Sequence, residues 1–405
     1  MPNRFRILSC AALATVSILL IVAGWWMTQW LVAGVGAGLL LASLVLAKLL
    51  LGRRHRKEVR NSSQSTKTTA TRPRAPAEPL AKRQAAHPGD LAEEMIAANR
   101  YALLLRPQIA GNLNRGQVED AREALEEDMA IVPEGDVFLC QPDDRDEHER
   151  PTKSTVGGRV LRVEAALIDR YPVTNFQFKQ FIDAGGYEEM ALWDSEIWPG
   201  VFGFVDATGQ PGPRFWNNGQ YAAGEDDHPV VGISWFEANA YSRWVGKRLP
   251  TDAEWVKTGC WPMPVQRGVP TQRRFPWGNT WEPDKANVWS AGIEATCSVT
   301  EFPDGASVAG VYGLVGNVWE WTADPFGLWH GANSYQGTEN FRSLRGGAFD
   351  TYFESQANCQ FQSGDSPLAR KRNIGFRCAI GLCDLHPGAA DDAVPAGDEL
   401  VCEGV

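Results

Sequence analysis

Two long uncharged stretches near the N-terminal end are the clearest hydrophobic pattern in the chain. Residues 7–27 contain no charged side chain, and residues 31–51 contain only Lys48. Each stretch is long enough to cross a bilayer core of about 30 Å as a helix that rises about 1.5 Å per residue. The pattern therefore predicts a transmembrane hairpin over residues 1–57, with two spans and a short turn.

Basic side chains flank this hairpin at its outer ends and are missing from its turn. Arg4 and Arg6 precede the first span, and Arg53, Arg54, Arg56 and Lys57 follow the second. The positive-inside rule then predicts an integral inner or plasma membrane protein with both termini and the main domain in the cytoplasm. If the first stretch were a cleaved signal peptide, the second would stop transfer and leave the same topology for the main domain. Gly34 and Gly38 have the small-xxx-small spacing that permits close helix approach, within one hairpin or between two chains.

Three patterns follow the hairpin. Residues 58–88 have almost no large apolar side chains, which predicts a disordered linker. Residues 89–128 have helical spacing and predict a neck of two helices, the first capped by Asp90 and ended by Pro107, the second from about residue 117 to residue 129. From residue 129 to residue 383, short strands and turns alternate with a few helices. Residues 384–405 are acidic and rich in proline and glycine, which predicts a disordered tail.

Charge and composition narrow the function. The chain has 39 basic and 49 acidic side chains, a net charge of −10, and residues 131–405 alone carry a net charge of −16. This balance argues against nucleic acid as a partner. Eight cysteines in 405 residues are too few for a disulfide scaffold, and the six histidines have no spacing typical of a zinc site. Sixteen tryptophans indicate a loop-rich fold pinned by large rings.

Six motifs occur in order within residues 129–383. They are HPV…SW at 228–235, GKRLPTDAEW at 246–255, FPWGN at 275–279, YGLVGNVWEW at 312–321, RGG at 345–347 and IGFRC at 374–378. This series resembles the formylglycine-generating enzyme (sulfatase-modifying factor) family. The resemblance implies an α+β, C-type-lectin-like fold with little regular structure, in which most of the motif residues are scaffold.

The resemblance also shows which chemical groups have changed. Founding members of the family oxidise a substrate cysteine with two copper-binding cysteines after the RGG strand, assisted by a serine and an arginine. Soft Cu(I) prefers paired thiolates. Counting from the glycines places the two cysteine positions on Thr351 and Gln356, and counting back from Cys359 places them on Phe349 and Glu354. The serine position is Ala348 and the arginine position is Gln362, so we expect neither catalytic residues of that type nor a copper cofactor.

Other family features are implied in part. Calcium binding through loop oxygens is implied for Asn287 and Val288 at one site, and for Gly316, Asn317, Val318 and Glu320 at a second, because hard Ca²⁺ prefers such oxygens. The alternative is that Asn317 and Glu320 only satisfy loop amides. The resemblance also pairs Cys260 with Cys359 as a structural contact.

Retained scaffold motifs and changed reactive positions favour a binding module, a pseudoenzyme, whose ligand is a protein, a peptide or a small molecule. The predicted cleft combines Trp329 and Tyr335, on a nearby loop, with Phe349, Asp350, Tyr352, Phe353, Glu354, Asn358, Gln360 and Gln362. One alternative is a divergent enzyme that uses Asp350, Glu354 or Asp365 in the same cleft. A further alternative is a lectin-like binding protein with a diversified surface over residues 351–362.

Overall fold

The computed structural model describes residues 88–140, 158–262, 265–266, 269–270, 272–330 and 334–385. The chain divides into two units, Met1–Glu78 and Pro79–Val405, and every described residue belongs to the second. The predicted transmembrane hairpin, the linker as far as residue 87 and the tail from residue 386 lie outside the described residues. Within the described ranges, no helix has the length and apolar character needed to cross a membrane.

The neck consists of four helices rather than the two that the sequence predicts. They are α2 (Pro88–Ala97), α3 (Tyr101–Leu104), α4 (Pro107–Ala110) and α5 (Arg115–Asp128). Asn99 adopts a left-handed φ of 58°, which breaks the expected first helix between α2 and α3. Pro107 occupies the first turn of α4, where its missing N–H costs nothing, instead of ending a helix. Asn114 caps α5 and exchanges hydrogen bonds with Gln117 in a capping box.

The neck packs directly on the rest of the fold. One hydrophobic cluster joins neck residues to strands and to the C-terminal end of the described chain (Ala92, Tyr101, Ala102, Leu104, Leu105, Ala121, Leu125, Met129, Leu167, Ile380, Leu382, Leu385). Neck and domain therefore share a core, and the division predicted at residue 129 does not separate two bodies.

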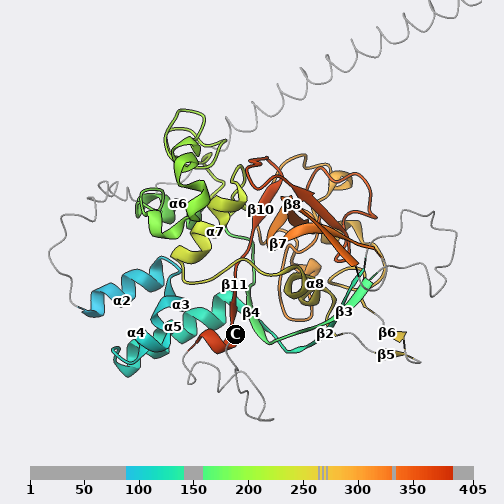
Figure 1. Ribbon diagram of the computed structural model, residues 1–405, viewed down its shortest axis with the longest axis horizontal. Helices are drawn as coiled ribbons and strands as arrows, with labels where there is room; N and C mark the ends of the chain where they lie inside the picture. The colour runs from blue at the N-terminus through green and yellow to red at the C-terminus, as the bar shows by residue number, and fades with distance from the viewer. Residues whose placement is uncertain are drawn as a thin grey trace, which may run out of the picture. The chain divides into compact units, whose positions relative to one another are not determined.

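Among the described residues, the β-structure consists of two small sheets and two hairpins (Figure 1). The three-stranded antiparallel sheet has the order β1 (Met129–Val132), β4 (Ala166–Asp169), β11 (Ala379–Gly381). The four-stranded sheet has the order β10 (Ile374–Phe376), β7 (Trp319–His330), β8 (Ser334–Arg345), β9 (Gln362–Asp365), with β10 parallel to β7 and the other pairs antiparallel. The hairpins are β2 (Gly135–Cys140) with β3 (Gly158–Val163) and β5 (Val265–Gln266) with β6 (Val269–Pro270).

Three capped helices accompany the sheets. They are α6 (Asn175–Asp183), α7 (Trp235–Trp244) and α8 (Asp252–Cys260), and each begins with a capping box, led by Thr174, Ser234 and Thr251 respectively. Short 3₁₀ turns fill the loops: η2 (Met190–Leu192), η3 (Ser195–Gly203), η4 (Pro283–Lys285), η5 (Trp289–Ala291), η6 (Pro303–Gly305) and η7 (Leu382–Asp384). Long loops with few regular elements confirm the α+β class that the sequence predicted.

Candidate functional site

Two glycines end β8 and turn the chain into the loop that carries the candidate site. Gly346 and Gly347 adopt φ values of 97° and 80°, which side chains rarely tolerate. A methyl group on Gly346 would lie 2.4 Å from the carbonyl oxygen of Leu314. The RGG motif is therefore a steric requirement of this turn, because the β8 end and the Leu314 backbone approach too closely for any Cβ.

A hydrogen bond between a hydroxyl group and the backbone holds the loop after the glycines. It lies at positions that the resemblance assigns to reactive residues of the family. Ala348 and Thr351 are both buried, and the Ala348 N–H donates to Thr351 Oγ1 over 2.8 Å. Gln356 and Phe349 are half-buried, and Glu354 is exposed. Thr351 thus acts as a side-chain anchor for the turn, and its hydroxyl is already engaged within the loop.

Gln362, which the resemblance places at the family's arginine position, belongs to a buried polar network centred on Asp252. Gln362 Nε2 and Arg345 Nη2 donate to Asp252 Oδ2 over 2.6 and 2.8 Å, and the hydroxyl groups of Thr322 and Ser343 donate to Asp252 Oδ1 over 2.7 Å each. Asp252 is therefore a fully paired carboxylate at the start of α8. Sequence reasoning placed it in a motif but missed this role, because its partners come from β7, β8 and β9.

Two features of this network are unusual. Arg345 Nε is buried and has no hydrogen-bond partner, although the same guanidinium pairs with Asp252. Asp324 accepts from the Asp252 backbone N–H over 2.6 Å, and burial together with the neighbouring Asp252 carboxylate raises the pKa of Asp324. Asp324 is therefore a carboxyl with a raised pKa in contact with the start of α8, and no motif in the sequence points to it.

Three aromatic rings form an exposed surface, here called the aromatic patch (Trp289, Tyr352 and Phe353). The Trp289 and Tyr352 ring centroids lie 4.8 Å apart, and those of Tyr352 and Phe353 lie 5.1 Å apart, both in edge-to-face arrangements. The three side chains are 54, 63 and 59% exposed. The backbone N–H of Trp289 donates to the backbone carbonyl of Thr351, and this bond connects the two loops. Trp289 was missed from sequence because it lies some sixty residues before its partners.

The other predicted cleft residues divide between the surface and the interior. Asp350 is exposed and accepts from Asn373 Nδ2 over 3.0 Å. Asn358 Oδ1 accepts from the backbone N–H groups of Gln360 and Phe361, so it stabilises a turn. Gln360 Nε2 reaches Cys260 Sγ at 3.1 Å. The structure therefore brings Asp350, Tyr352, Phe353 and Glu354 to one surface and turns Asn358 and Gln360 inward.

Trp329 and Tyr335 lie on strands rather than on the loop that the sequence predicted. They are paired across β7 and β8, near the end of the hairpin farthest from Arg345. Arg345 comes ten positions after Tyr335 in β8, about 30 Å at the usual rise of a strand. The pairing of β7 with β8 continues to these positions despite register shifts around Pro325. The pair is thus remote from the RGG turn along the strand.

Other protein groups already occupy most of the oxygen atoms that the sequence predicts as calcium ligands. Glu320 is completely buried, and Arg377 binds it through Nε to Oε2 and Nη2 to Oε1, at 2.7 Å each. Trp255 Nε1 also donates to Glu320 Oε2 over 2.6 Å. A guanidinium on both carboxylate oxygens competes with a cation for the same position. Glu320 in this arrangement therefore does not fit a calcium ligand.

The loop oxygens are engaged in the same way. Asn317 Oδ1 accepts from Asn287 Nδ2 and from the Cys297 N–H, and the carbonyl groups of Gly316 and Val288 accept from nearby N–H groups. Asn317 itself has a φ of 63°, and the Val318 N–H supplies the bond to Gly316. Asn287 Oδ1 is the one oxygen of this set that is buried without a partner. Within the described ranges, no three His, Cys, Asp or Glu side chains come together as a metal site.

Cys260 and Cys359 lie together as buried free thiols. Both are almost completely buried, and a hydrogen bond joins them. Burial and this bond raise the pKa of Cys359 well above its ordinary value. Cys359 also lies 2.6 Å from the position of a Cβ on Gly259, so the closeness of α8 to this loop depends on that glycine. Both thiols are shielded from solvent, unlike reactive cysteines, which are partly exposed.

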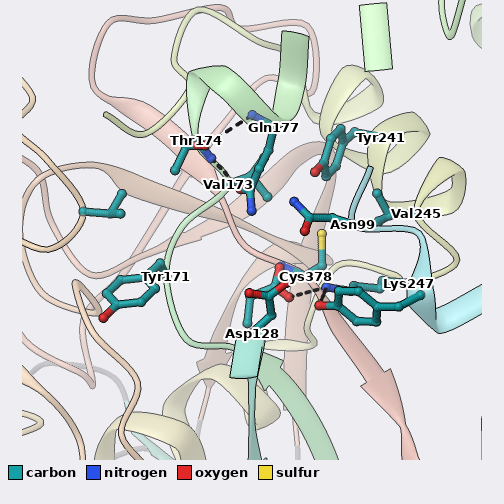
Figure 2. A pocket seen from close by; sticks show the side chains of 13 residues that line it. Asn99, Asp128, Tyr171, Val173, Thr174, Gln177, Tyr241, Val245, Lys247 and Cys378 are labelled. Atoms are coloured by element: carbon teal, nitrogen blue, oxygen red, sulfur yellow. Dashed lines mark hydrogen bonds and ion pairs between the residues drawn. The ribbon is translucent and has the colours of Figure 1, made fainter. Parts of the chain in front are cut away.

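A separate polar cavity of about 90 Å³ lies where the neck meets the domain (Figure 2). Lys247 Nζ donates to Tyr101 and to Asp169 Oδ1, over 2.7 Å each. Burial alone would lower the pKa of Lys247, but the adjacent Asp169 carboxylate raises it well above its ordinary value. Figure 2 shows Asp128, Lys247 and Cys378 grouped at one end of the cavity and Thr174 with Gln177 at the other. The Lys247–Asp169 ion pair lies within the domain, and the hydrogen bond from Lys247 to Tyr101 connects the domain to the neck at this cavity.

Fold, motif order and the RGG turn define a sulfatase-modifying-factor type of domain. Residues 114–382, more than half of the chain, match the sulfatase-modifying factor enzyme 1-like domain, and the chain belongs to this family. The match begins at Asn114, the residue that caps α5, so it includes the last neck helix.

Curated relatives agree with this assignment. The chain is similar to a hercynine oxygenase of Mycolicibacterium thermoresistibile, 33% identical over 254 residues that cover 58% of this chain and 53% of that protein. It is also similar to the formylglycine-generating enzyme of Thermomonospora curvata, 32% identical over 295 residues that cover 62% of this chain and 92% of the relative. The chain thus spans about half the length of the hercynine oxygenases that it matches.

Solved structures include distant neighbours. PvdO from Pseudomonas aeruginosa is 21% identical, with a TM-score of 0.41, and the match covers 63% of this chain and 94% of PvdO. CarF is 17% identical, with a TM-score of 0.38, over 63% of this chain and 98% of CarF.

Proposed function

We propose that this chain is a membrane-anchored binding protein whose sulfatase-modifying-factor domain lacks the copper-binding cysteine pair. The observation that carries the proposal is the state of the loop after the RGG turn. Its buried position is filled by Thr351, which bonds to the Ala348 N–H, and the residues beyond it present aromatic rings to solvent.

The loop after the RGG turn lacks the thiol groups that copper-dependent cysteine oxidation requires. Residues 346–358 contain no thiol in either alignment of the motif. The nearest candidates along the chain, Cys359 and its neighbour Cys260, are shielded by burial and engaged with each other and with Gln360. A thiol with a raised pKa is a poor metal ligand and a poor nucleophile, because the thiolate is the reactive form.

Recognition is the chemistry that the same loop supports. Tyr and Trp side chains provide large, rigid contact area at a low cost in conformational entropy. The backbone bond from Trp289 to Thr351 and the anchoring of the Thr351 hydroxyl hold together the two loops that carry the rings before any ligand arrives. Preorganisation of this kind favours affinity because little ordering remains to be done on binding.

The proposal includes the location and partners expected from the sequence. The hairpin over residues 1–57 anchors the chain in a membrane, and the basic flanks place the acidic domain in the cytoplasm. With a net charge of −16 over residues 131–405, the domain takes a protein, a peptide or a small ligand rather than nucleic acid. A reporter fused to the C-terminus tests this topology, and a periplasmic signal contradicts it.

A divergent enzyme is a second candidate, favoured by the raised pKa of Asp324 beside Asp252 and by the enzyme names of the relatives. Of the carboxylates at the surface, Asp365 pairs with Lys371 and Asp350 bonds to Asn373, whereas Glu354 is exposed. An enzyme of this kind would use carboxyl groups for proton transfer rather than thiols.

The deciding experiment uses the full chain purified in detergent. The protein is loaded with Cu(I) and incubated aerobically with a cysteine-containing peptide, and mass spectrometry follows the peptide. We expect no formylglycine, beside full conversion by a formylglycine-generating enzyme treated in parallel. Turnover of the peptide by the wild-type chain would overturn the binding proposal.

A further inference from the structure

The loops that form the aromatic patch carry charge of one sign only. Residues 289–295 and 350–355 contain Glu294, Asp350 and Glu354 and no lysine or arginine. All three carboxylates are on exposed residues. An aromatic surface whose own loops carry three carboxylates, in a stretch (residues 131–405) of net charge −16, attracts positively charged groups.

The exposed rings suit a cation for a second reason. The face of an aromatic ring carries partial negative charge, so a guanidinium or ammonium group over Trp, Tyr or Phe is attracted to it. We propose that the aromatic patch binds a peptide segment carrying arginine or lysine, with Asp350 and Glu354 pairing to its cationic side chains. This inference rests on the proposed binding function and names the ligand class.

The dimensions of the patch set the size of the recognised segment. The consecutive centroid distances of 4.8 and 5.1 Å give a path of at most about 10 Å across the three rings. An extended chain covers about 3.3 Å per residue, so the patch contacts about three residues. A segment this short with two cationic side chains can place one over a ring and the other beside a carboxylate.

The surface is held in place by contacts beneath it. Asn373 Nδ2 lies 3.0 to 3.1 Å from both oxygens of Asp350, and Thr351 is anchored by the Ala348 N–H. Tyr352 and Phe353 follow directly on these two fixed residues. The Asp350 carboxylate and the backbone that leads into the rings are therefore held before the ligand binds, which lowers the entropy lost on association.

Charge also argues against other occupants of the patch. A second copy of this chain brings another net charge of −16 over residues 131–405, and like charges across an interface weaken association. An anionic membrane surface would be repelled by the same three carboxylates. A neutral glycan could stack on the rings, but its binding would not depend on Asp350 or Glu354.

The test measures binding of short labelled peptides to the full chain in detergent by fluorescence anisotropy. The probes are a pentapeptide with two arginines separated by glycine, its counterpart with two glutamates and its counterpart with two serines, each at low and at moderate salt. We expect the arginine peptide to bind at least tenfold more tightly than the other two, and its affinity to fall as salt rises. A neutral oligosaccharide is the fourth probe.

Variants assign the binding to the patch. Trp289→Ala and Tyr352→Ala should each lower the affinity for the arginine peptide by about two- to fivefold, the range of an exposed cation–π contact. The double variant Asp350→Asn with Glu354→Gln flattens the salt dependence. Matched controls are Phe202→Ala, an aromatic residue 82% exposed in η3, and Glu126→Gln, an exposed carboxylate in α5; neither changes the affinity.

The outcomes separate this inference from the proposed function. Suppose that the serine peptide or the oligosaccharide binds as tightly as the arginine peptide, and that Tyr352→Ala abolishes this binding. The patch then binds ligands, but the inference that its ligand is a cationic peptide is wrong. If the arginine peptide binds equally to wild type and to both patch variants, the inference is overturned because binding lies elsewhere. Turnover of a cysteine peptide in the copper assay would overturn the proposed function itself.

Discussion

The buried ion pair between Arg377 and Glu320 offers the sharpest test of how this domain is held together. Both side chains are completely buried, and two hydrogen bonds of 2.7 Å join them. Arg377 also donates to the carbonyl oxygens of Tyr312 and Asp169. These contacts connect the YGLVGNVWEW and IGFRC motifs with β4, so one guanidinium joins three segments far apart in sequence.

Replacing Arg377 by methionine should destabilise the domain severely. In the variant, Glu320 stays buried with Trp255 as its remaining donor, and the two carbonyl groups lose their partner. Removing one member of a buried ion pair costs about 3–5 kcal/mol. Because folded proteins are stable by only about 5–15 kcal/mol, this loss is a large share of the total. At about 2–4 °C per kcal/mol, the melting temperature should fall by roughly 6–20 °C.

The assay is thermal unfolding of the full chain in detergent, followed by tryptophan fluorescence. Arg377→Met and Glu320→Gln are measured singly and together, and the double variant should lose less than the sum of the two because it leaves no uncompensated charge. Arg115→Met removes the exposed pair with Glu119 and is the control, with a change within about 0.5 kcal/mol.

Two results would refute this reasoning. A melting temperature for Arg377→Met within 2 °C of wild type would show that the pair contributes little. A rise in the wild-type melting temperature with CaCl₂ that chelator reverses and Glu320→Gln abolishes would show that Glu320 binds calcium instead of Arg377.

Three further predictions concern the turn, the neck and the thiols. Gly346→Ala should destabilise the domain by at least about 2 kcal/mol in urea unfolding, since it adds a backbone clash to an unfavourable φ. The control is Gly209→Ala, where φ is 88° and the space around the glycine is open, so the loss of stability should be smaller. Equal losses for the two variants would contradict the clash. Burial raises the pKa of Asp128 despite the nearby Lys247, so the folded state disfavours its charge: Asp128→Asn should be more stable than wild type at pH 7, with the advantage lost as pH falls through the folded-state pKa. Mass spectrometry after native maleimide labelling should find exposed Cys383 modified well before buried Cys359, and equal rates would contradict the burial.

Local sequence signals predicted the local structure where they did not compete with the rest of the fold. Ser234 and Thr251, each followed three residues later by glutamate, begin helices as capping boxes. The neck departed from its pattern at Asn99, where a left-handed residue breaks what helical spacing alone would continue. Trp329 and Tyr335 likewise followed their strands rather than the loop expected from the motifs around them.

The site depended on contacts between distant segments. Tyr352 and Phe353 could be named from their place after the RGG motif, but Trp289 joins them only because its loop bonds to Thr351. Glu320 looked like a metal ligand in sequence, and its partner Arg377 lies 57 residues further along the chain. No periodicity or spacing relates residues so far apart.

The sequence by itself determined the motif order, the family, the α+β class and the absence of cysteines from the loop after RGG, because these depend on residue identity along a continuous chain. Tertiary structure decided which carboxylates are paired and which are exposed. It also decided that the neck shares a core with the domain and that three rings from two loops form one surface. The physical reason is that burial and charge pairing arise between segments that folding brings together, and the free energy of a buried charge depends on those neighbours.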